Sequence, residues 1–154
     1  MTVTFCGHRD VSEPETIRAW LSETVEGLIR EGADRFYLGG YGRFDALAAA
    51  VVREQKERHP EIRSVLVLPY LDREYDVDLY DESLYPPLES TPKRFAISKR
   101  NEYMINAADC VIAYVVHDFG GSYNSLCYAQ RKNKRVIRYK QDFALPPANA
   151  CSHY

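Results

Sequence analysis

Two glycine-rich stretches are the parts of this sequence most suited to chemistry, because each joins a strand pattern to a helix pattern. The first is GGYG at 39–42 and the second is GGSYNS at 120–125. Glycine lets an anion approach the backbone closely, and the amide groups and dipole of a helix N-terminus favour negative charge. Either stretch alone is equally consistent with a plain tight turn. Together at one edge of a sheet, they favour a ligand that carries a phosphate or a ribose.

Polar side chains near these stretches extend the candidate site. Asp45 lies in the first turn of its helix, where it either complements the helix dipole or binds ribose hydroxyls. Arg100 lies on a later helix and has the planar guanidinium that pairs with phosphate. No catalytic residue is assigned. The predicted ligand-binding residues are Gly7, His8, Arg9, Gly39, Gly40, Tyr41, Gly42, Asp45, Pro69, Arg100, Asn101, Gly120, Gly121, Ser122, Tyr123, Asn124 and Ser125.

Three further patterns favour a structural interpretation over a catalytic one. His8 follows a strand directly, where a hydrogen-bonded turn histidine is more common than a catalytic base. Cys127 and His117 could suggest a thiol nucleophile, but the SLCYA context of the cysteine indicates packing on the sheet. The DVD triplet at 76–78 lies among other acidic residues that can stay solvated. We therefore predict no metal site and no cofactor.

Strand and helix patterns alternate along the chain. Buried strands are expected at 3–8, 35–40, 64–70, 109–116 and 135–140, and helices at 14–32, 44–59, 93–108 and 122–134. Strands separated by helices predict an α/β fold with a mostly parallel sheet of about five strands and helices on both faces. In such three-layer sheets, ligands bind beyond the carboxyl ends of the strands. Both glycine stretches lie at such ends.

Two segments depart from this alternation within the single domain expected over 1–154. Residues 71–92 are acidic and rich in tyrosine, and they include a Pro-Pro pair. Long excursions of this kind in compact domains are often functional, so we predict a lid or binding loop. Residues 141–154 have no strong periodicity and predict an irregular tail.

Composition limits the classes of partner. The net charge of −2 gives no basic footprint, so nucleic acid is not expected as a partner. No apolar run approaches the roughly 20 residues that span a bilayer, and the N-terminus lacks an export signal. The 4 cysteines have no C-x-x-C spacing, which argues against a structural zinc site. Cys6 and Cys110 lie in apolar strand-like runs, as small core residues do, so a reduced cytoplasmic protein is expected. The 12 tyrosines favour binding, through either an interface or a ligand pocket.

The order of these motifs resembles the SLOG superfamily, the Rossmann-like group that includes the LOG phosphoribohydrolases, the DprA recombination mediator and the YpsA-like proteins. GGYGRFDALAAA is similar to the family's G-x-G-x-D-x-x-A turn, and TFCGHR is similar to the start of YpsA-like members. RNEYMINAADCVIAYVV followed by GGSYNSL is similar to the second signature, and Arg100 stands four residues before Met104 as the family's arginine does. The resemblance implies a Rossmann-like domain with a nucleotide-like ligand, and a homodimer as a common assembly.

The chemistry at this site stays open. The phosphoribohydrolases use a glutamate in the helix after the second glycine loop, and this chain has no Glu or Asp between Gly120 and Tyr139. We therefore predict a module that binds a nucleotide or nucleotide-derived small molecule, as a sensor or by sequestering it. One alternative is an N-glycosidic hydrolase or transferase acting on a nucleoside monophosphate, with Asp45 or an acid from 72–82 replacing that glutamate. Another is a protein-interaction module that uses the tyrosine-rich segment.

The first glycine stretch carries a geometric prediction. Residues 39–42 should form a strand-to-helix turn that faces the ligand, and the helix from about Phe44 should point its N-terminus at the pocket. The second stretch, 120–125, should lie opposite. Arg100 and Gly121 are expected outside the core, so substituting them should weaken binding without unfolding the protein.

Overall fold

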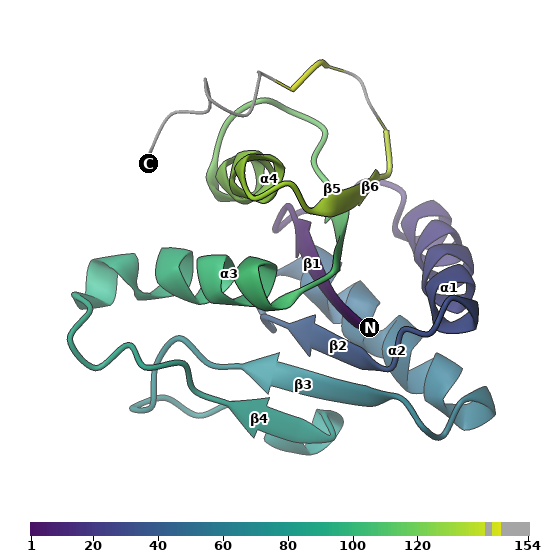
Figure 1. Ribbon diagram of the computed structural model, residues 1–154, viewed down its shortest axis with the longest axis horizontal. Coiled ribbons are helices and arrows are strands. Elements are labelled where there is room, and N and C mark those ends of the chain that lie inside the picture. Colours follow the sequence, from purple (N-terminus) through teal and green to yellow (C-terminus); the bar gives the residue numbers. More distant parts are fainter. Residues whose placement is uncertain (141–142, 146–154) are drawn as a thin grey trace.

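The computed structural model describes residues 1–140 and 143–145, so residues 141–142 and 146–154 of the expected tail lie outside the described residues. Six strands form one sheet in the order β4-β3-β2-β1-β5-β6, and every neighbouring pair is parallel (Figure 1). The strands are β1 (Thr2–Gly7), β2 (Arg35–Leu38), β3 (Arg63–Val67), β4 (Glu82–Leu84), β5 (Cys110–Tyr114) and β6 (Arg135–Arg138). The expected parallel α/β fold is confirmed, with one strand more than the sequence pattern indicates.

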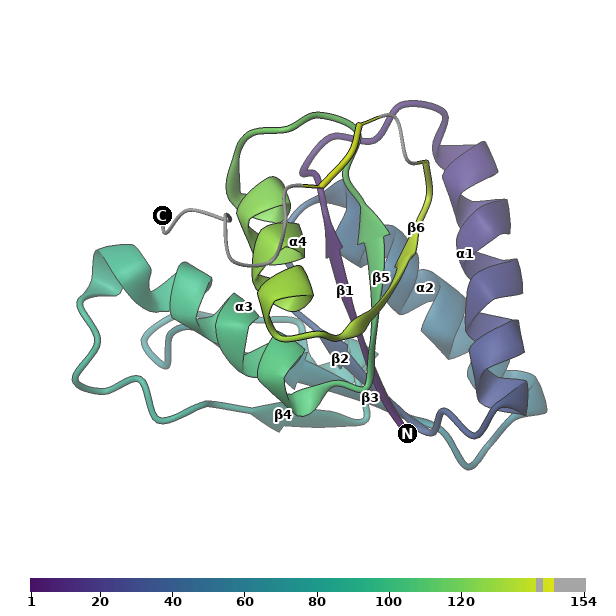
Figure 2. The same cartoon turned by 45° about the horizontal axis from the view of Figure 1, so that its top comes forward.

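Four α-helices connect the strands and cover both faces of the sheet (Figure 2). They are α1 (Pro14–Arg30), α2 (Arg43–Arg58), α3 (Ala96–Ala107) and α4 (Gly121–Arg131). Short 3₁₀ turns lie between β3 and β4, at Val77–Leu79, and directly before α3, at Lys93–Phe95. In α1, the buried side chains recur at helical spacing, as Ile17, Leu21, Val25 and Leu28. Among the described residues, no helix has the length and apolar character needed to cross a membrane.

The two faces of the sheet contribute to separate clusters of buried side chains. Strand residues point alternately to opposite faces, so a strand covered on both faces is apolar throughout. In β5, Cys110, Ile112 and Tyr114 pack into the same cluster as α1 and α2. The intervening Val111 and Ala113 pack with α3 and α4. This alternation explains the continuous apolar run of that strand.

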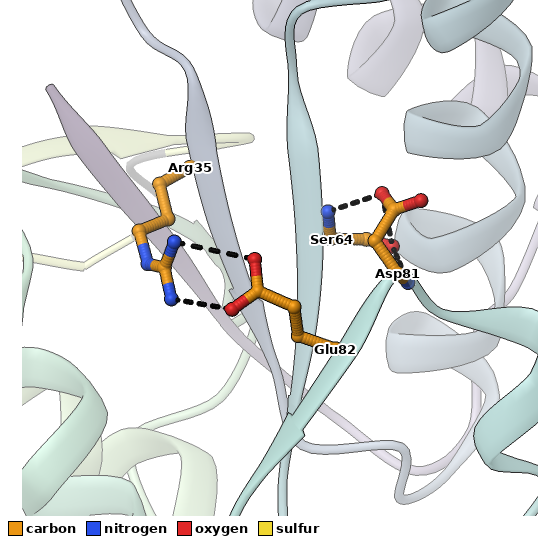
Figure 3. Close-up of polar contacts among 4 residues, drawn as sticks. All are labelled: Arg35, Ser64, Asp81 and Glu82. Carbon is orange, nitrogen blue, oxygen red and sulfur yellow. Dashed lines mark hydrogen bonds and ion pairs between the residues drawn. The ribbon is translucent and has the colours of Figure 1, made fainter.

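The sixth strand lies within the acidic segment 71–92, where the sequence predicts only a lid or binding loop. Figure 3 shows how β4 is fixed at the edge of the sheet: Glu82 accepts two hydrogen bonds from the Arg35 guanidinium, at 2.9 and 3.3 Å. Asp81 accepts from the Ser64 amide at 2.8 Å, and the Asp81 amide donates to Ser64 Oγ at 3.0 Å. Part of the segment is therefore an element of the sheet, and a lid role for the remainder stays a prediction.

The direction in which strands are added reverses between β1 and β5. After β1 the chain builds β2, β3 and β4 on one side, and it then crosses to build β5 and β6 on the other. The connections leaving β1 and β5 diverge at such a switch point, which opens a crevice beyond the carboxyl ends of the two strands. Both connections can be followed above the sheet in Figure 2.

Candidate functional site

A cavity of about 810 Å³ lies in this crevice. Its lining comes from the end of β1 and the loop after it, the end of β5 and the loop after it, one face of α3 and the first turns of α4. Small-molecule sites in α/β proteins have this location and this range of volumes. Of the predicted ligand-binding residues, the cavity is lined by Gly7, His8, Arg9, Tyr41, Asp45, Arg100, Asn101, Gly120, Gly121, Ser122 and Ser125.

The other six predicted residues do not line the cavity. They are Gly39, Gly40, Gly42, Pro69, Tyr123 and Asn124. No residue of the acidic segment 71–92 lines it either. Ligand binding by the residues that do line it stays a prediction, now confined to one place in the fold.

His8 forms part of the cavity wall. Its Nε2 accepts a hydrogen bond from the Val116 amide at 2.9 Å, which places the ring proton of the neutral imidazole on Nδ1. Burial and the nearby His117 lower the pKa of His8 to about 4. His8 is therefore uncharged at neutral pH and supplies a flat, neutral surface, as the structural interpretation of this histidine expects.

Two rings continue from His8 towards solvent. The His8 and His117 rings are stacked, with centroids 3.8 Å apart and planes 14° apart. The His117 and Phe119 rings are stacked in turn, at 4.0 Å and 20°. Neither His117 nor Phe119 is among the ligand-binding residues predicted from the sequence. His117 is considered there only as a partner of Cys127, which is buried in α4 and does not line the cavity. His117 and Phe119 could have been predicted from their position, because 117–119 lie directly between the end of β5 and the second glycine loop.

The N-terminus of α4 opens onto the cavity. Its first helical hydrogen bond runs from the Asn124 amide to the Gly120 carbonyl, so the amides of Gly121 and Ser122 have no intrahelical partner. A Cβ on Gly120 or Gly121 would meet no atom within 4 Å, so packing does not fill the space at this turn. Ser125 lines the cavity at the same end of α4 and is 4% exposed.

The first glycine stretch is used differently from the prediction. The Arg43 amide, at the start of α2, donates to the Arg9 carbonyl at 2.8 Å. A Cβ on Gly42 would lie 2.9 Å from Arg9 Cα, so glycine allows this close approach. The loop after β1 therefore occupies the N-terminus of α2, where a ligand was expected. Within the stretch 39–42, only Tyr41 lines the cavity.

Tyr41 is held at the cavity edge from two sides. Its amide donates to Asp45 Oδ2 at 3.0 Å. Its hydroxyl accepts from Arg9 Nη2 at 3.1 Å, and the Arg9 guanidinium lies 4.8 Å from the centre of the ring. Arg9 and Tyr41 thus cover each other at the rim, in a cation–π contact.

Arg100 is buried and hydrogen-bonded to the backbone of other segments, so the expectation that it lies outside the core was wrong. It is 2% exposed. Its Nη1 donates to the carbonyls of Gly39 and Val67, each at 2.9 Å, so Arg100 holds α3 against the ends of β2 and β3. Its Nε donates to Asn101 Oδ1 at 2.9 Å. Most of its hydrogen-bonding capacity therefore supports the walls of the cavity.

Asp45 and Arg100 both lie close to Gly39. A Cβ on Gly39 would lie 3.1 Å from Asp45 Oδ2 and 3.2 Å from Arg100 Cζ, which explains glycine at this position. Burial raises the pKa of Asp45 to about 6, against the opposing effects of the Tyr41 amide and the Arg100 charge. Asp45 is thus a half-buried carboxyl at the cavity that changes charge near neutral pH.

Solved structures share this fold at low sequence identity. DNA processing protein A from Helicobacter pylori superposes with a TM-score of 0.64 and 20% identity, over 97% of this chain and 69% of that chain. TM1055 gives a TM-score of 0.61 and 18% identity, over 88% of this chain and 71% of that one. The Moco carrier protein of Chlamydomonas gives 0.56 and 15%, over 89% and 74%.

Two proteins are similar in sequence. The SPbeta prophage-derived protein YoqJ of Bacillus subtilis is 26% identical over 136 residues, which is 72% of this chain and 78% of that protein. The UPF0398 protein BH1768 of Halalkalibacterium halodurans is 23% identical over 138 residues, which is 80% of this chain and 71% of that protein. No family model matches the chain.

The Helicobacter pylori structure corrects one expectation. That protein is described by its binding of single-stranded DNA, and it has the fold seen here. The prediction that nucleic acid is not a partner, which rested on net charge, was therefore wrong, because a slightly negative net charge does not exclude nucleic acid for this fold.

The fold and the motifs now agree. The parallel sheet, the switch point between β1 and β5, and the glycine loop that begins α4 all match the resemblance stated from the sequence. The solved structures of DNA processing protein A, TM1055 and the Moco carrier protein have the same SLOG-type fold. This chain therefore has the Rossmann-like α/β fold of these solved structures.

Proposed function

We propose that this domain binds a nucleotide or nucleotide-derived small molecule in the cavity between β1 and β5. The observation that carries the proposal is the pairing of two kinds of surface in one cavity. A helix N-terminus with Ser125 in the cavity lining suits a phosphate, and an aromatic wall suits a base.

The electrostatics near α4 support an anionic group. The first turn of α4 contains no acidic residue, so nothing in that turn competes with an incoming anion. The amides of Gly121 and Ser122 and the helix dipole contribute partial positive charge at the same end of the helix. The Arg9 guanidinium adds a full positive charge at the rim of the cavity.

Binding without turnover is the form of this function that we favour. The second glycine loop and the helix after it contain no carboxylate, since no Glu or Asp occurs between Gly120 and Tyr139. A general acid or an oxocarbenium-stabilising group is therefore missing from the position where the phosphoribohydrolases have it. A sensor or sequestering module needs only the binding surfaces.

Calorimetry of the purified protein tests the proposal directly. The panel consists of AMP, GMP, CMP, UMP and ribose 5-phosphate, together with a single-stranded oligonucleotide, because a protein of this fold binds single-stranded DNA. At least one mononucleotide should bind. If none binds, or if only the oligonucleotide does, the small-molecule function is wrong.

A matched pair of glycine variants locates the site. Gly121→Val adds a branched side chain where the cavity meets α4, and it should reduce nucleotide affinity roughly tenfold or more. Gly27→Val is the control, because Gly27 is also a helical glycine at which a Cβ meets nothing within 4 Å, and it lies in α1 away from the cavity. Equal nucleotide affinity of the two variants would place the ligand elsewhere.

A second candidate function is cleavage of the N-glycosidic bond of a nucleoside monophosphate. The observation that favours it is Asp45, a half-buried cavity carboxyl whose pKa is raised to about 6. A carboxyl with such a pKa can act as general acid or base near neutral pH. The acids at 72–82, which were the other source considered, do not line the cavity.

Incubation with nucleoside monophosphates and chromatography for free base decides between binding and cleavage. Release of base that is abolished in Asp45→Asn and retained in Asp10→Asn would establish the enzyme. Asp10 is the suitable control because it also lines the cavity. Absence of released base while a mononucleotide binds would leave the binding module.

A further inference from the structure

The rings of His8, His117 and Phe119 form a column along one wall of the cavity, here called the aromatic column. Its centroid separations of 3.8 and 4.0 Å are shorter than the roughly 4.5–7 Å of ordinary aromatic pairs. Its interplanar angles of 14° and 20° make the three rings nearly parallel. The column therefore presents its end ring face-on rather than edge-on.

Both inner rings of the column are fixed by hydrogen bonds. His8 is held by the Val116 amide at 2.9 Å. His117 Nδ1 lies 3.1 Å from the Phe119 carbonyl oxygen, so a proton on Nδ1 ties the middle ring to the backbone of the outer one. A platform that is already ordered loses little conformational freedom when a ligand binds.

Phe119 is the open end of this column. Phe119 is 65% exposed although it lines the cavity, and one face of its ring packs on His117. An exposed phenyl ring gains free energy when a second flat, apolar surface covers it. The other exposed aromatic ring of the lining, Tyr41, differs because the Arg9 guanidinium already lies over it.

We propose that the outer face of Phe119 is the stacking platform for a heteroaromatic base of the ligand, at the mouth of the cavity. The inference rests on the proposed function and assigns an orientation to it: the base lies at Phe119, and the phosphate lies at the N-terminus of α4. Phe119 precedes Gly121 by two residues, a span of at most about 7 Å along the chain, so one mononucleotide can reach both. Every nucleobase has a stacking face, so the platform should accept purines and pyrimidines alike and bind the larger purines more tightly.

Two substitutions of Phe119 and one control test the platform. Phe119→Ala removes the ring, and AMP affinity should fall roughly 5- to 150-fold, which corresponds to about 1–3 kcal/mol of base stacking. Ribose 5-phosphate has no base, so its affinity should not change. Phe119→Trp keeps a stacking face, and AMP should bind it at least as tightly as the parent. Phe95→Ala is the control, because Phe95 is an exposed phenylalanine outside the cavity.

Fluorescence supplies a readout that a merely structural role would not give. Trp20 is the single native tryptophan and packs on Tyr139 outside the cavity lining. In the Phe119→Trp variant, AMP should therefore quench the new tryptophan, whereas ribose 5-phosphate should not.

The outcomes separate this inference from the proposed function. If the parent protein binds none of the mononucleotides, the proposed function fails and the platform fails with it. If AMP binds the parent and Phe119→Ala equally, or if Phe119→Ala weakens AMP and ribose 5-phosphate by the same factor, the platform alone is wrong. Matching thermal melting curves for the variants and the parent exclude unfolding as the cause.

Discussion

Arg100 and Gly39, 61 residues apart in the sequence, are joined by a hydrogen bond of 2.9 Å from the buried guanidinium to the backbone carbonyl. The same Nη1 bonds the Val67 carbonyl at 2.9 Å, so one side chain closes the ends of two strands against α3. Arg100, which the sequence predicts as a phosphate ligand, therefore stabilises the packing of the elements around the site. Substituting it tests the fold as well as the ligand.

We expect Arg100→Ala to destabilise the protein by about 2–4 kcal/mol. Two buried carbonyls lose their donor, at roughly 1–3 kcal/mol each, and the lost side chain leaves a cavity. Urea denaturation measures the effect. Lys99→Ala, an exposed neighbour on the same helix, should change the free energy of unfolding by less than about 0.5 kcal/mol. Arg100→Ala as stable as Lys99→Ala would show that these hydrogen bonds contribute little.

Asp45→Asn should stabilise the protein relative to the parent, increasingly as pH rises from about 4 to about 6. The pKa of Asp45 is raised from 3.8 to about 6 on folding, so its contribution to stability is present below pH 3.8 and is lost as pH rises through 6. Asparagine keeps an oxygen acceptor for the Tyr41 amide and carries no charge. The difference should be of order 1–2 kcal/mol at pH 7, allowing for the partial exposure of the group. Urea denaturation at several pH values measures it, and a pH-independent difference would show that Asp45 is not perturbed.

His8 should oppose Asp45 over the same pH range. Its pKa is lowered from 6.5 to about 4 on folding, so the stability it contributes is present above pH 6.5 and is lost as pH falls through 4. NMR titration of the ring protons should show a midpoint near 4 for His8. A midpoint near 6.5 would contradict the burial and the stacking on His117 described here.

Gly7→Ala should be strongly destabilising although it adds a single methyl group. A Cβ at Gly7 would lie 2.2 Å from a ring carbon of Phe44, which is fully buried. Overpacking of this kind costs about 1–3 kcal/mol. Gly27→Ala, in α1 with open space around it, should instead stabilise by up to about 1 kcal/mol. Thermal or urea unfolding of both variants gives the comparison, and equal effects would mean that Phe44 moves aside freely.

The sequence predicts the sheet well where periodicity carries the information. Five strands and four helices follow from apolar runs and helical spacing, since burial on both faces imposes those patterns. β4 escaped prediction because three residues, ESL, have no apolar pattern, and their place depends on contacts with Arg35 and Ser64 far along the chain. Tertiary contacts of this kind leave no local signal.

The candidate site likewise has features that the sequence predicts and features that depend on tertiary contacts. The rule that ligands bind beyond strand ends needs only the strand order and the loops, and 11 of the 17 predicted residues line the cavity. The burial of Arg100 and the covering of α2 by Arg9 depend on contacts between distant segments. The aromatic column was missed because each of its rings is unremarkable in sequence, and only the pairing of β1 with β5 brings His8 beside His117.

Strand β4, at one edge of the sheet, also bears on whether copies of this chain can associate edge to edge. A free sheet edge is a template for another chain, and proteins limit that risk with short edge strands and charged side chains. β4 is three residues long and carries Glu82, whereas the opposite edge, β6, has four residues and carries Arg135 and Arg138. Both margins of the sheet therefore resist the addition of further strands, so concentrated solutions of the folded protein should withstand fibrillar aggregation.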